Sequence, residues 1–287
     1  MRVTIFGATG MLGKALVRQW KSKDTTDEVT GLGSAQADIR DPAQVERAIL
    51  QSKPDCVVLC AAYTDVDGCE RNPDLASAVN TSGAVNVARA AADAGAKLLF
   101  VSTDYVFDGA NSTPYETGDA RNPINAYGRS KAEAEEASLS ILPDACIVRA
   151  SWLFGPGGKC FPDTILKVAA NLPEGEVVTV VNDQRGCPTY TLDLADAIVA
   201  LCKSEARGIV HCTNRGECSW YDFAVEIIQQ AGVKTAVRPT TSEKFLRPAA
   251  RPKYSVLSSA SLAKYGIEMR PWQQTLSDYL LERSNAT

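Results

Sequence analysis

Short apolar runs alternate with longer amphipathic segments through the first half of the chain. The apolar runs are RVTIF, EVTGL, CVVLC, KLLFV and CIVRA, which occupy residues 2–6, 28–32, 56–60, 97–101 and 146–150. Runs of this length that are apolar almost throughout are typical of strands buried on both faces of a parallel sheet. We therefore expect these segments to form neighbouring parallel strands.

The segments between the apolar runs have the period of amphipathic helices. One helix is predicted to open at Asp41-Pro42, where the aspartate can cap and the proline suits the first turn. Others are expected from about residue 73 to 94 and from about residue 126. Strands separated by helices imply an α/β fold with a doubly wound parallel sheet. The first helix follows the first strand, with apolar side chains three and four residues apart at Leu12, Ala15, Leu16 and Trp20.

The second half of the chain is less regular. A glycine-rich segment at 155–158 is a candidate crossing to a second lobe, VVTVV at 177–181 is a candidate strand, and the last helix is expected over about 272–283. The loops at 104–125 and 240–256 are longer than ordinary connections, which favours a role in substrate binding.

Composition and charge exclude several classes of protein. The chain has 287 residues, of which 45% are hydrophobic and 22% charged, as in ordinary globular proteins. A formal net charge of −4 argues against a nucleic-acid partner. Because glycine and threonine interrupt the first ten residues, we expect no signal peptide and no membrane span, and hence a cytoplasmic protein.

The cysteines and the single histidine give no sign of a metal or a hydrolase site. The nine cysteines include no CxxC pair, so we interpret them as small buried hydrophobic residues. A serine–histidine–acid triad could form only around His211, and no GxSxG motif accompanies it. His211 is therefore predicted to be a strand residue.

A glycine-rich motif directly follows the first strand. GATGMLG, residues 7–13, matches GxxGxxG, in which glycines allow a tight turn and close approach to a pyrophosphate. The following helix would supply free N–H groups to the phosphates. Gly33 and Ser34 stand where NAD-binding domains usually place a carboxylate at the end of the second strand, and no arginine obviously marks a 2′-phosphate site. The cofactor is therefore predicted to be NADPH or NADH.

Tyr127 and Lys131 form a candidate acid–base pair. They lie four residues apart at a predicted helix start and so share one helix face. A nearby ammonium favours phenolate, so Lys131 is expected to lower the pKa of Tyr127 from its usual value of about 10. Surface pairs of this kind are common, and the interpretation depends on Thr103. That hydroxyl comes just after a strand and can stabilise a carbonyl oxygen that gains charge.

Four segments together resemble the extended short-chain dehydrogenases, and most closely the reductases of dTDP-4-dehydrorhamnose. These segments are GATGMLG, STDYVFDG, YGRSK and VNDQRGCPT, and the resemblance covers nearly the whole chain. It implies hydride transfer from NAD(P)H to the C4 ketone of a nucleotide sugar, dTDP-4-dehydro-L-rhamnose, to give dTDP-L-rhamnose. Tyr127 would donate the proton, and Lys131 would also hold the nicotinamide ribose.

The resemblance and the glycine motif also imply binding residues. Thr103, Asp104 and Trp152 would contact the substrate. Basic residues around 247–253 are candidates for the diphosphate, and we select Arg251, although solvated charges on a linker would give the same pattern. The implied cofactor-binding residues are Gly7, Thr9, Gly10, Met11, Leu12, Gly13, Asp38, Ile39, Ala61, Ala62, Tyr63, Thr64, Tyr127 and Lys131.

We divide the chain accordingly into two domains. Residues 1–152, with roughly 185–212, are predicted to form a Rossmann-type NAD(P)-binding domain. Roughly 153–184 and 213–287 are predicted to form a smaller mixed α/β substrate-binding domain.

In one respect the chain departs from the family pattern. Some members form a magnesium-bridged dimer through glutamates in the first helix and after the PT motif, but this chain has Lys14-Ala15-Leu16 and Tyr190-Thr191-Leu192 there. We therefore expect no metal, and a monomer or weak homodimer.

Two alternatives to this function remain open. One is a sister reductase that acts on another nucleotide 4-keto-sugar or gives the opposite configuration at C4. The other is a non-catalytic NADP-binding regulatory subunit of the kind associated with methionine adenosyltransferase. The presence of Thr103, Tyr127 and Lys131 together argues against the second.

Overall fold

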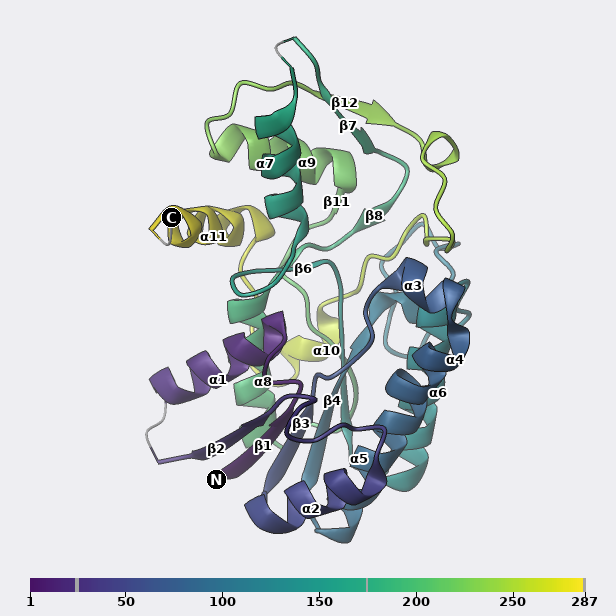
Figure 1. Ribbon diagram of the computed structural model, residues 1–287, viewed down its shortest axis with the longest axis vertical. Helices are drawn as coiled ribbons and strands as arrows, with labels where there is room; N and C mark the ends of the chain where they lie inside the picture. Colours follow the sequence, from purple (N-terminus) through teal and green to yellow (C-terminus); the bar gives the residue numbers. More distant parts are fainter. Residues whose placement is uncertain (24–25, 174, 286–287) are drawn as a thin grey trace.

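A parallel sheet of six strands forms the lower part of the molecule (Figure 1). The computed structural model describes residues 1–23, 26–173 and 175–285. The strand order is β10-β5-β4-β3-β1-β2, and all neighbours are parallel. The predicted doubly wound α/β fold is confirmed. The strands are β1 (Arg2–Phe6), β2 (Glu28–Leu32), β3 (Cys56–Leu59), β4 (Lys97–Thr103), β5 (Cys146–Ala150) and β10 (Gly208–His211).

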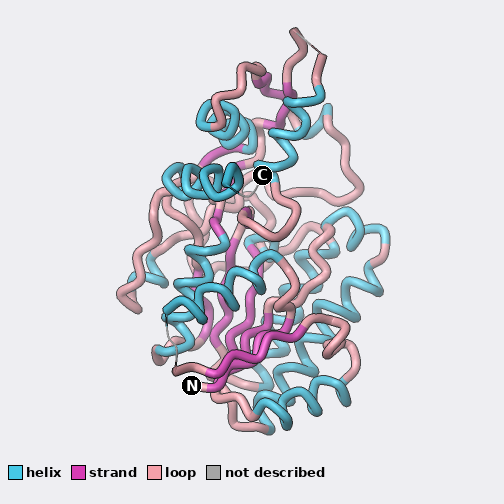
Figure 2. Tube along the Cα trace, turned by 60° about the vertical axis from the view of Figure 1, so that its left-hand side comes forward, coloured by secondary structure: helices cyan, strands magenta, loops and turns pink. Residues whose placement is uncertain are grey.

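Helices cover both faces of this sheet, and Figure 2 shows the strands running between them. Because successive side chains of a strand point to opposite faces, Val58 belongs to one buried cluster and Val57 to another. The Val58 cluster contains residues of α1 (Met11–Lys23) and α8 (Thr191–Lys203). The Val57 cluster contains residues of α2 (Pro42–Ser52), α5 (Gly83–Asp93) and α6 (Ala126–Ile141). The apolar strands are therefore buried on both sides, as their sequences predicted.

The helix expected from about residue 73 to 94 is not a regular α-helix throughout. It follows α3 (Val66–Arg71) and begins as α4 (Pro73–Ala76), continues as a π-helical turn over Ser77–Ser82, and ends as α5. Asn80 is buried in the π-helical turn, where its Oδ1 accepts a hydrogen bond from the Tyr63 N–H at 2.8 Å. Single π turns of this kind often mark functional sites.

The upper region of the molecule in Figure 1 contains small two-stranded sheets and the helices α7 (Phe161–Asn171), α9 (Trp220–Gln230) and α11 (Trp272–Asn285). Its interior holds a third hydrophobic cluster, which includes Phe154 and Phe223. The strand VVTVV was predicted correctly as β7, which pairs with β12. The sheets are β6 (Leu153–Phe154) with β9 (Thr189–Tyr190), β7 (Val178–Val181) with β12 (Val237–Thr240), and β8 (Arg185–Gly186) with β11 (Cys218–Ser219).

The two long loops lie against each other. Each contains a 3-10 turn, Asp104–Val106 in the first and Ser242–Lys244 in the second. The Tyr115 N–H donates to the Val256 carbonyl at 2.8 Å, so the later parts of the two loops are joined by backbone hydrogen bonding. The short helix α10 (Ala260–Ala263) follows and contacts β10.

The cysteines and the histidine are placed as the sequence predicted. All nine cysteines are free thiols, and all but Cys60 are buried. His211 ends β10 and is buried beside Arg149. Burial and the Arg149 charge lower the pKa of His211 to about 3, so it is neutral at physiological pH. Among the described residues, no helix is long and apolar enough to cross a membrane, and no three metal-binding side chains come together.

Candidate active site

The glycine motif forms a tight turn at the centre of the sheet edge. Gly7 follows β1 with a φ of 91°, and a Cβ there would lie 2.5 Å from the Ala61 nitrogen. A Cβ on Gly13 would lie 2.1 Å from the Gly7 carbonyl oxygen. Both positions therefore require glycine, because any larger residue would collide with backbone atoms.

This turn lies where the strand order reverses. The chain passes from β1 outward to β2 and then to β3 on the other side of β1. Ligands of doubly wound sheets bind at such a switch point. Helix α1 begins there at Met11 with no acidic residue in its first turn, so its N–H groups face the turn without a competing carboxylate. The cradle fits the pyrophosphate of a dinucleotide.

The other predicted cofactor residues surround this turn. Thr9 lies against Gly33 at the end of β2, where a Cβ on the glycine would meet the Thr9 methyl at 2.6 Å. Leu12 is buried in the core, so its backbone rather than its side chain faces the turn. Gly10 donates its N–H to the Gly7 carbonyl at 3.0 Å, which closes the turn.

The segment after β2 carries Asp38 and Ile39. The Ile39 carbonyl accepts a hydrogen bond from Asn86 at 2.9 Å. Asp38 pairs with Arg40, whose Nη2 lies 2.5 Å from Oδ2, and hydrogen bonding to Arg40 lowers the pKa of Asp38. Arg40 is a cation beside the predicted adenine site that we did not single out from the sequence.

The segment 61–64 follows β3 at the same edge of the sheet as the glycine turn. It contains Ala61, Ala62, Tyr63 and Thr64. The Ala61 N–H donates to the Phe6 carbonyl at 3.0 Å, which holds the start of this segment beside β1. Asn80 fixes Tyr63 and also donates to the Ser130 hydroxyl at 3.0 Å. The π-helical turn therefore joins this segment to α6.

Thr103 and Tyr127 come together at the end of β4. Thr103 is the last residue of β4, and Tyr127 lies in the first turn of α6, which Asn125 caps. The Thr103 hydroxyl lies close to the Tyr127 phenol. The Thr103 hydroxyl also donates to Asp104 Oδ1 at 3.0 Å and accepts the Tyr105 N–H at 3.2 Å. The predicted pair of hydroxyls is thus brought into contact.

The prediction that Lys131 lowers the pKa of Tyr127 is wrong. Burial raises the pKa of Tyr127 above its ordinary value, and the nearby Thr103 hydroxyl acts in the opposite direction. The Lys131 ammonium is directed elsewhere, because Nζ donates to the Val101 carbonyl at 2.8 Å and lies 4.0 Å from the centre of the Phe100 ring. A raised pKa keeps the phenol protonated at neutral pH, which is the state that a proton donor requires.

Lys131 is itself buried, and its pKa is shifted. Burial lowers its pKa to about 7, and the Glu135 carboxylate opposes this fall. Glu135 is fully buried and pairs with Arg149 through two hydrogen bonds of 2.9 and 2.6 Å. It also accepts the Ser102 hydroxyl at 2.5 Å. This ion pair, which we missed in the sequence, ties α6 to β4 and β5 behind the catalytic face.

Asp104 presents a polar atom without a protein partner. The residue is buried, and none of the described side chains or backbone groups hydrogen-bonds to its Oδ2. Burial raises the pKa of Asp104 to about 7. Since buried polar atoms normally have partners, this oxygen is suited to a ligand hydroxyl.

Arg251 is held close to the two tyrosines. Tyr105 packs edge-on against Tyr127, with ring centroids 6.0 Å apart, and the nearby Arg251 guanidinium opposes the rise in the Tyr105 pKa that burial causes. Arg251 Nη1 also donates to Asp67 Oδ1 at 2.6 Å and to the Ala249 carbonyl at 2.6 Å. Arg251 is therefore not a solvated charge on a linker.

Asp67 explains how this loop is held. It accepts hydrogen bonds from Arg251 and, at 3.3 Å, from Arg247, and these contacts lower its pKa to about 2. Asp67 belongs to α3, so a carboxylate beside the sheet anchors a loop that comes from the upper region.

Trp152 follows β5 and leads into the upper region. It is half-buried, and its indole stacks on that of Trp220 with centroids 3.5 Å apart. Trp152 follows β5, the strand next to β4, at the same edge of the sheet as Thr103. The contacts already described link Thr103 with Tyr127, Asp104 and Arg251.

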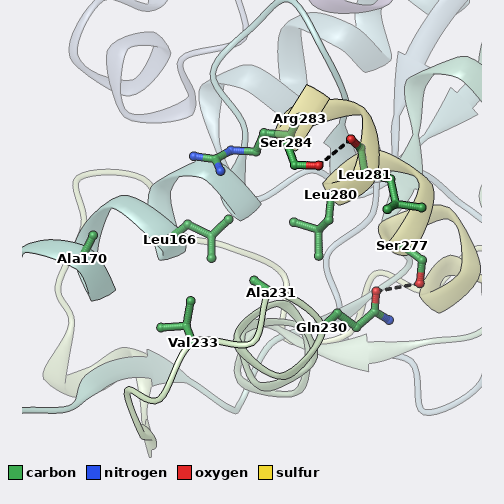
Figure 3. A pocket seen from close by; sticks show the side chains of 10 residues that line it. All are labelled: Leu166, Ala170, Gln230, Ala231, Val233, Ser277, Leu280, Leu281, Arg283 and Ser284. Carbon is green, nitrogen blue, oxygen red and sulfur yellow. Dashed lines mark hydrogen bonds between the residues drawn. The ribbon is translucent and has the colours of Figure 1, made fainter. Parts of the chain in front are cut away.

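A separate cavity of about 680 Å³ lies between α7, α9 and α11 (Figure 3). Leu166, Val233 and Leu280 are among its lining residues. None of the residues predicted to bind cofactor or substrate lines it. The strand-edge cluster is therefore the candidate active site.

Comparison with known proteins places the whole chain in one family. A family model described as "RmlD substrate binding domain" matches residues 1–285. The dTDP-4-dehydrorhamnose reductase of Mycobacterium tuberculosis is 42% identical over 294 residues, which cover 100% of this chain and 94% of that protein.

Two solved structures are similar over nearly their full length. A dTDP-4-dehydrorhamnose reductase from Clostridium acetobutylicum gives a TM-score of 0.95 at 39% identity, covering 99% of this chain and 100% of that chain. The Bacillus anthracis dTDP-4-dehydrorhamnose reductase in complex with NADP gives 0.92 at 37% identity, covering 98% and 99%. The chain therefore belongs to the RmlD family, the dTDP-4-dehydrorhamnose reductases among the extended short-chain dehydrogenases, as its motifs predicted.

Proposed function

We propose that this protein reduces the C4 ketone of dTDP-4-dehydro-L-rhamnose to give dTDP-L-rhamnose, with NADPH or NADH as the reductant. The observation that carries the proposal is the contact between the Thr103 hydroxyl and the Tyr127 phenol at the end of β4. Both groups lie at the carboxyl edge of the sheet, as does the glycine cradle after β1.

The cofactor would lie across the switch point. The pyrophosphate fits the turn of Gly7, Gly10 and Gly13, and the first turn of α1 supplies N–H groups. Asp38 and Ile39 would flank the adenine, and the segment from Ala61 to Thr64 would line the path to the nicotinamide. Lys131 would hold the nicotinamide ribose. When bound, the reduced cofactor supplies the hydride.

The chain's own residues complete the reduction. Thr103 turns its single hydroxyl proton from Asp104 Oδ1 to the C4 carbonyl oxygen and stabilises the charge that grows there. As a C4–H bond forms and the carbonyl π bond breaks, Tyr127 transfers its phenolic proton to this oxygen. The ketone is reduced by two electrons, and the phenolate of Tyr127 regains its proton from solvent.

The substrate would span the two predicted domains. The sheet-bearing domain, residues 1–152 with roughly 185–212, would hold the cofactor, and roughly 153–184 with 213–287 would hold the nucleotide sugar. Asp104 would accept a sugar hydroxyl through its unpartnered Oδ2. Trp152 would pack beside the sugar ring, and Arg251 would bind the diphosphate.

A direct assay tests this proposal. Purified protein is mixed with dTDP-4-dehydro-L-rhamnose and either NADPH or NADH, and cofactor absorbance is followed. We expect one cofactor to be oxidised for each ketone reduced. If the cofactor binds and no oxidation occurs, the enzyme proposal fails and the non-catalytic regulatory subunit is favoured. A product that is the 4-epimer would instead favour the sister reductase.

Two further features belong to the proposal. Because the family's bridging glutamates are replaced by Lys14-Ala15-Leu16 and Tyr190-Thr191-Leu192, we infer a monomer or weak homodimer without metal, which sedimentation at several concentrations would test. Nine free cysteines fit a reducing compartment, which supports a cytoplasmic location.

A further inference from the structure

Trp152 has a backbone conformation that is rare for a large side chain. Its φ is 48°, in the left-handed region that residues other than glycine seldom adopt. Among the described residues, Lys53 is the other non-glycine residue with a positive φ, and it caps the end of α2, where this conformation is common. Trp152 ends no helix. Conformations of this kind tend to persist where function requires them.

The backbone on both sides of Trp152 is fixed. The Ser151 hydroxyl donates to the Cys187 carbonyl at 2.7 Å, and the Trp152 carbonyl accepts the Thr189 N–H at 3.2 Å. The strand β6 begins at the next residue and pairs with β9. The segment after β5 is therefore held in place, and the indole direction is set by its own contacts.

Two contacts define the position of the Trp152 indole. It stacks on Trp220 with ring centroids 3.5 Å apart and planes inclined by 8°. It also lies close to Gly186, where an added Cβ would be 2.5 Å from the indole Cε2. One face of the Trp152 ring is covered by Trp220, so a ligand can reach only the remainder of the ring.

Trp220 is itself held by regular structure of the upper region. It is the first residue of α9, which Ser219 and Asp222 cap through a reciprocal capping box. Ser219 ends β11, which pairs with the β8 strand that contains Gly186. Phe161 of α7 packs on Trp220 with centroids 4.5 Å apart. Trp220 is thus a fixed surface against which Trp152 is placed.

We propose that Trp220 is a positioning residue for the sugar, which acts by holding the Trp152 indole in the orientation against which the sugar ring packs. This inference rests on the proposed function and deepens it. The upper region would then select the sugar through an aromatic stack, while the strand edge performs the reduction.

A purely structural role for Trp220 predicts a different result. Loss of packing in the upper region would weaken binding of every ligand that this region touches, including the nucleotide. A positioning role acts only on the sugar, because Trp220 contacts Trp152, and Trp152 is the residue proposed to pack against the sugar. Comparison of dTDP-L-rhamnose with dTDP, which lacks the sugar, separates the two roles.

Calorimetry measures the affinity of the cofactor-bound protein for dTDP-L-rhamnose and for dTDP. The variants are Trp220→Leu, which removes the stack, and Trp220→Phe, which keeps a flat ring. Trp272→Phe is the matched control, because Trp272 is buried in the same hydrophobic cluster and does not contact Trp152 among the described aromatic pairs.

We expect Trp220→Leu to weaken dTDP-L-rhamnose binding by roughly five- to tenfold, the size of an aromatic pair contribution, with dTDP and cofactor binding unchanged. Trp220→Phe should restore most of the loss, and Trp272→Phe should lower Tm without changing either ligand. Equal weakening of dTDP and dTDP-L-rhamnose, or no weakening of either, would overturn the inference.

A second variant covers the case in which Trp220→Leu does not fold. Gly186→Ala adds a methyl group against the same indole, and we expect it to weaken dTDP-L-rhamnose selectively as well. Failure of the proposed function would look different, because wild-type protein would then bind dTDP-L-rhamnose no more tightly than dTDP. Selective binding by wild type with no change in Gly186→Ala would contradict only the role of the stack.

Discussion

The strand-edge cluster and the upper region contribute to the site in different ways. Thr103 lies on the regular strand β4, and Tyr127 and Lys131 lie on the regular helix α6. Buried Glu135 of α6 joins this helix to β4 through Ser102 and to β5 through Arg149. The upper region instead reaches the site through irregular segments. Side-chain contacts such as the Asp67–Arg251 ion pair and the Trp152–Trp220 stack help to hold these segments.

This difference indicates that the strand-edge cluster performs proton transfer and that the upper region selects the sugar. Proton transfer requires donor and acceptor to be placed within a fraction of an ångström, which rigid elements achieve better than loops. Selection of a sugar can be achieved by loops that vary between relatives on the same scaffold. Changes at the strand edge should therefore affect the chemical step, and changes in the upper region should affect substrate binding.

The largest effect is expected for Tyr127→Phe. Removal of the phenolic proton should lower kcat by about 10²- to 10⁴-fold, because a general acid is lost while the ring remains. Cofactor affinity, measured by calorimetry, should stay close to that of the wild type. Turnover within a factor of two of wild type would show that another group donates the proton.

The next effect concerns the rigidity of the strand edge. Glu135→Gln should lower the free energy of unfolding by about 3 kcal/mol, because it leaves the buried Arg149 without its counter-charge. Denaturant titration measures this loss. Glu136→Gln is the control, since the Glu136 side chain is 77% exposed and should change stability little. Equal stability of the two variants would mean that the buried pair does not hold the cluster together.

A smaller effect is expected where the loop of the upper region is anchored. Asp67→Asn should raise KM for the nucleotide sugar by roughly three- to tenfold, because it weakens the charge-assisted hydrogen bonds that place Arg251. The value of kcat should change little. Asp74→Asn, an exposed change on the neighbouring α4, serves as the control. A fall in kcat without a change in KM would contradict the proposal that the upper region affects substrate binding and not the chemical step.

The last effect is a change in stability at Asp104 that depends on pH. Its folded-state pKa is about 7, raised by burial from 3.8, so the folded state binds more protons than the unfolded state between these values. Stability therefore falls as pH rises through this window, and the cost of the buried carboxylate is fully present above pH 7. Asp104→Asn removes this cost. Its Tm should exceed that of wild type by a few degrees at pH 8 and match it near pH 3.5; a constant difference across this range would argue against the raised pKa.

Much of the sheet was predictable because its signals are local. The apolar runs gave the strands, and the glycine motif gave the turn that Gly7 and Gly13 occupy. The π-helical turn over Ser77–Ser82 was not predictable, because its sequence has the period of an ordinary helix. The hydrogen bonds of Asn80 with Tyr63 and Ser130 form only in the folded chain.

The site was predicted in part for the same reason. Motifs identified Thr103, Tyr127 and Lys131, and the structure brings Thr103 and Tyr127 into contact. The sign of the Tyr127 pKa shift was wrong because burial, which is a tertiary property, outweighs the expected charge effect. Trp220 lies 68 positions from Trp152 by residue number, and no local pattern connects them. The spacing of four places Lys131 and Glu135 on one face of α6, but no local pattern connects Glu135 with its partner Arg149.

Isotopic labelling of the transferred hydride tests the proposed reduction most directly. Wild-type protein is given dTDP-4-dehydro-L-rhamnose and a reduced cofactor that carries deuterium at the transferable nicotinamide position, and the product is analysed by NMR. We expect dTDP-L-rhamnose with deuterium bound to C4 of the sugar. A product with no deuterium in the sugar, or with deuterium at another carbon, would contradict the proposed reduction.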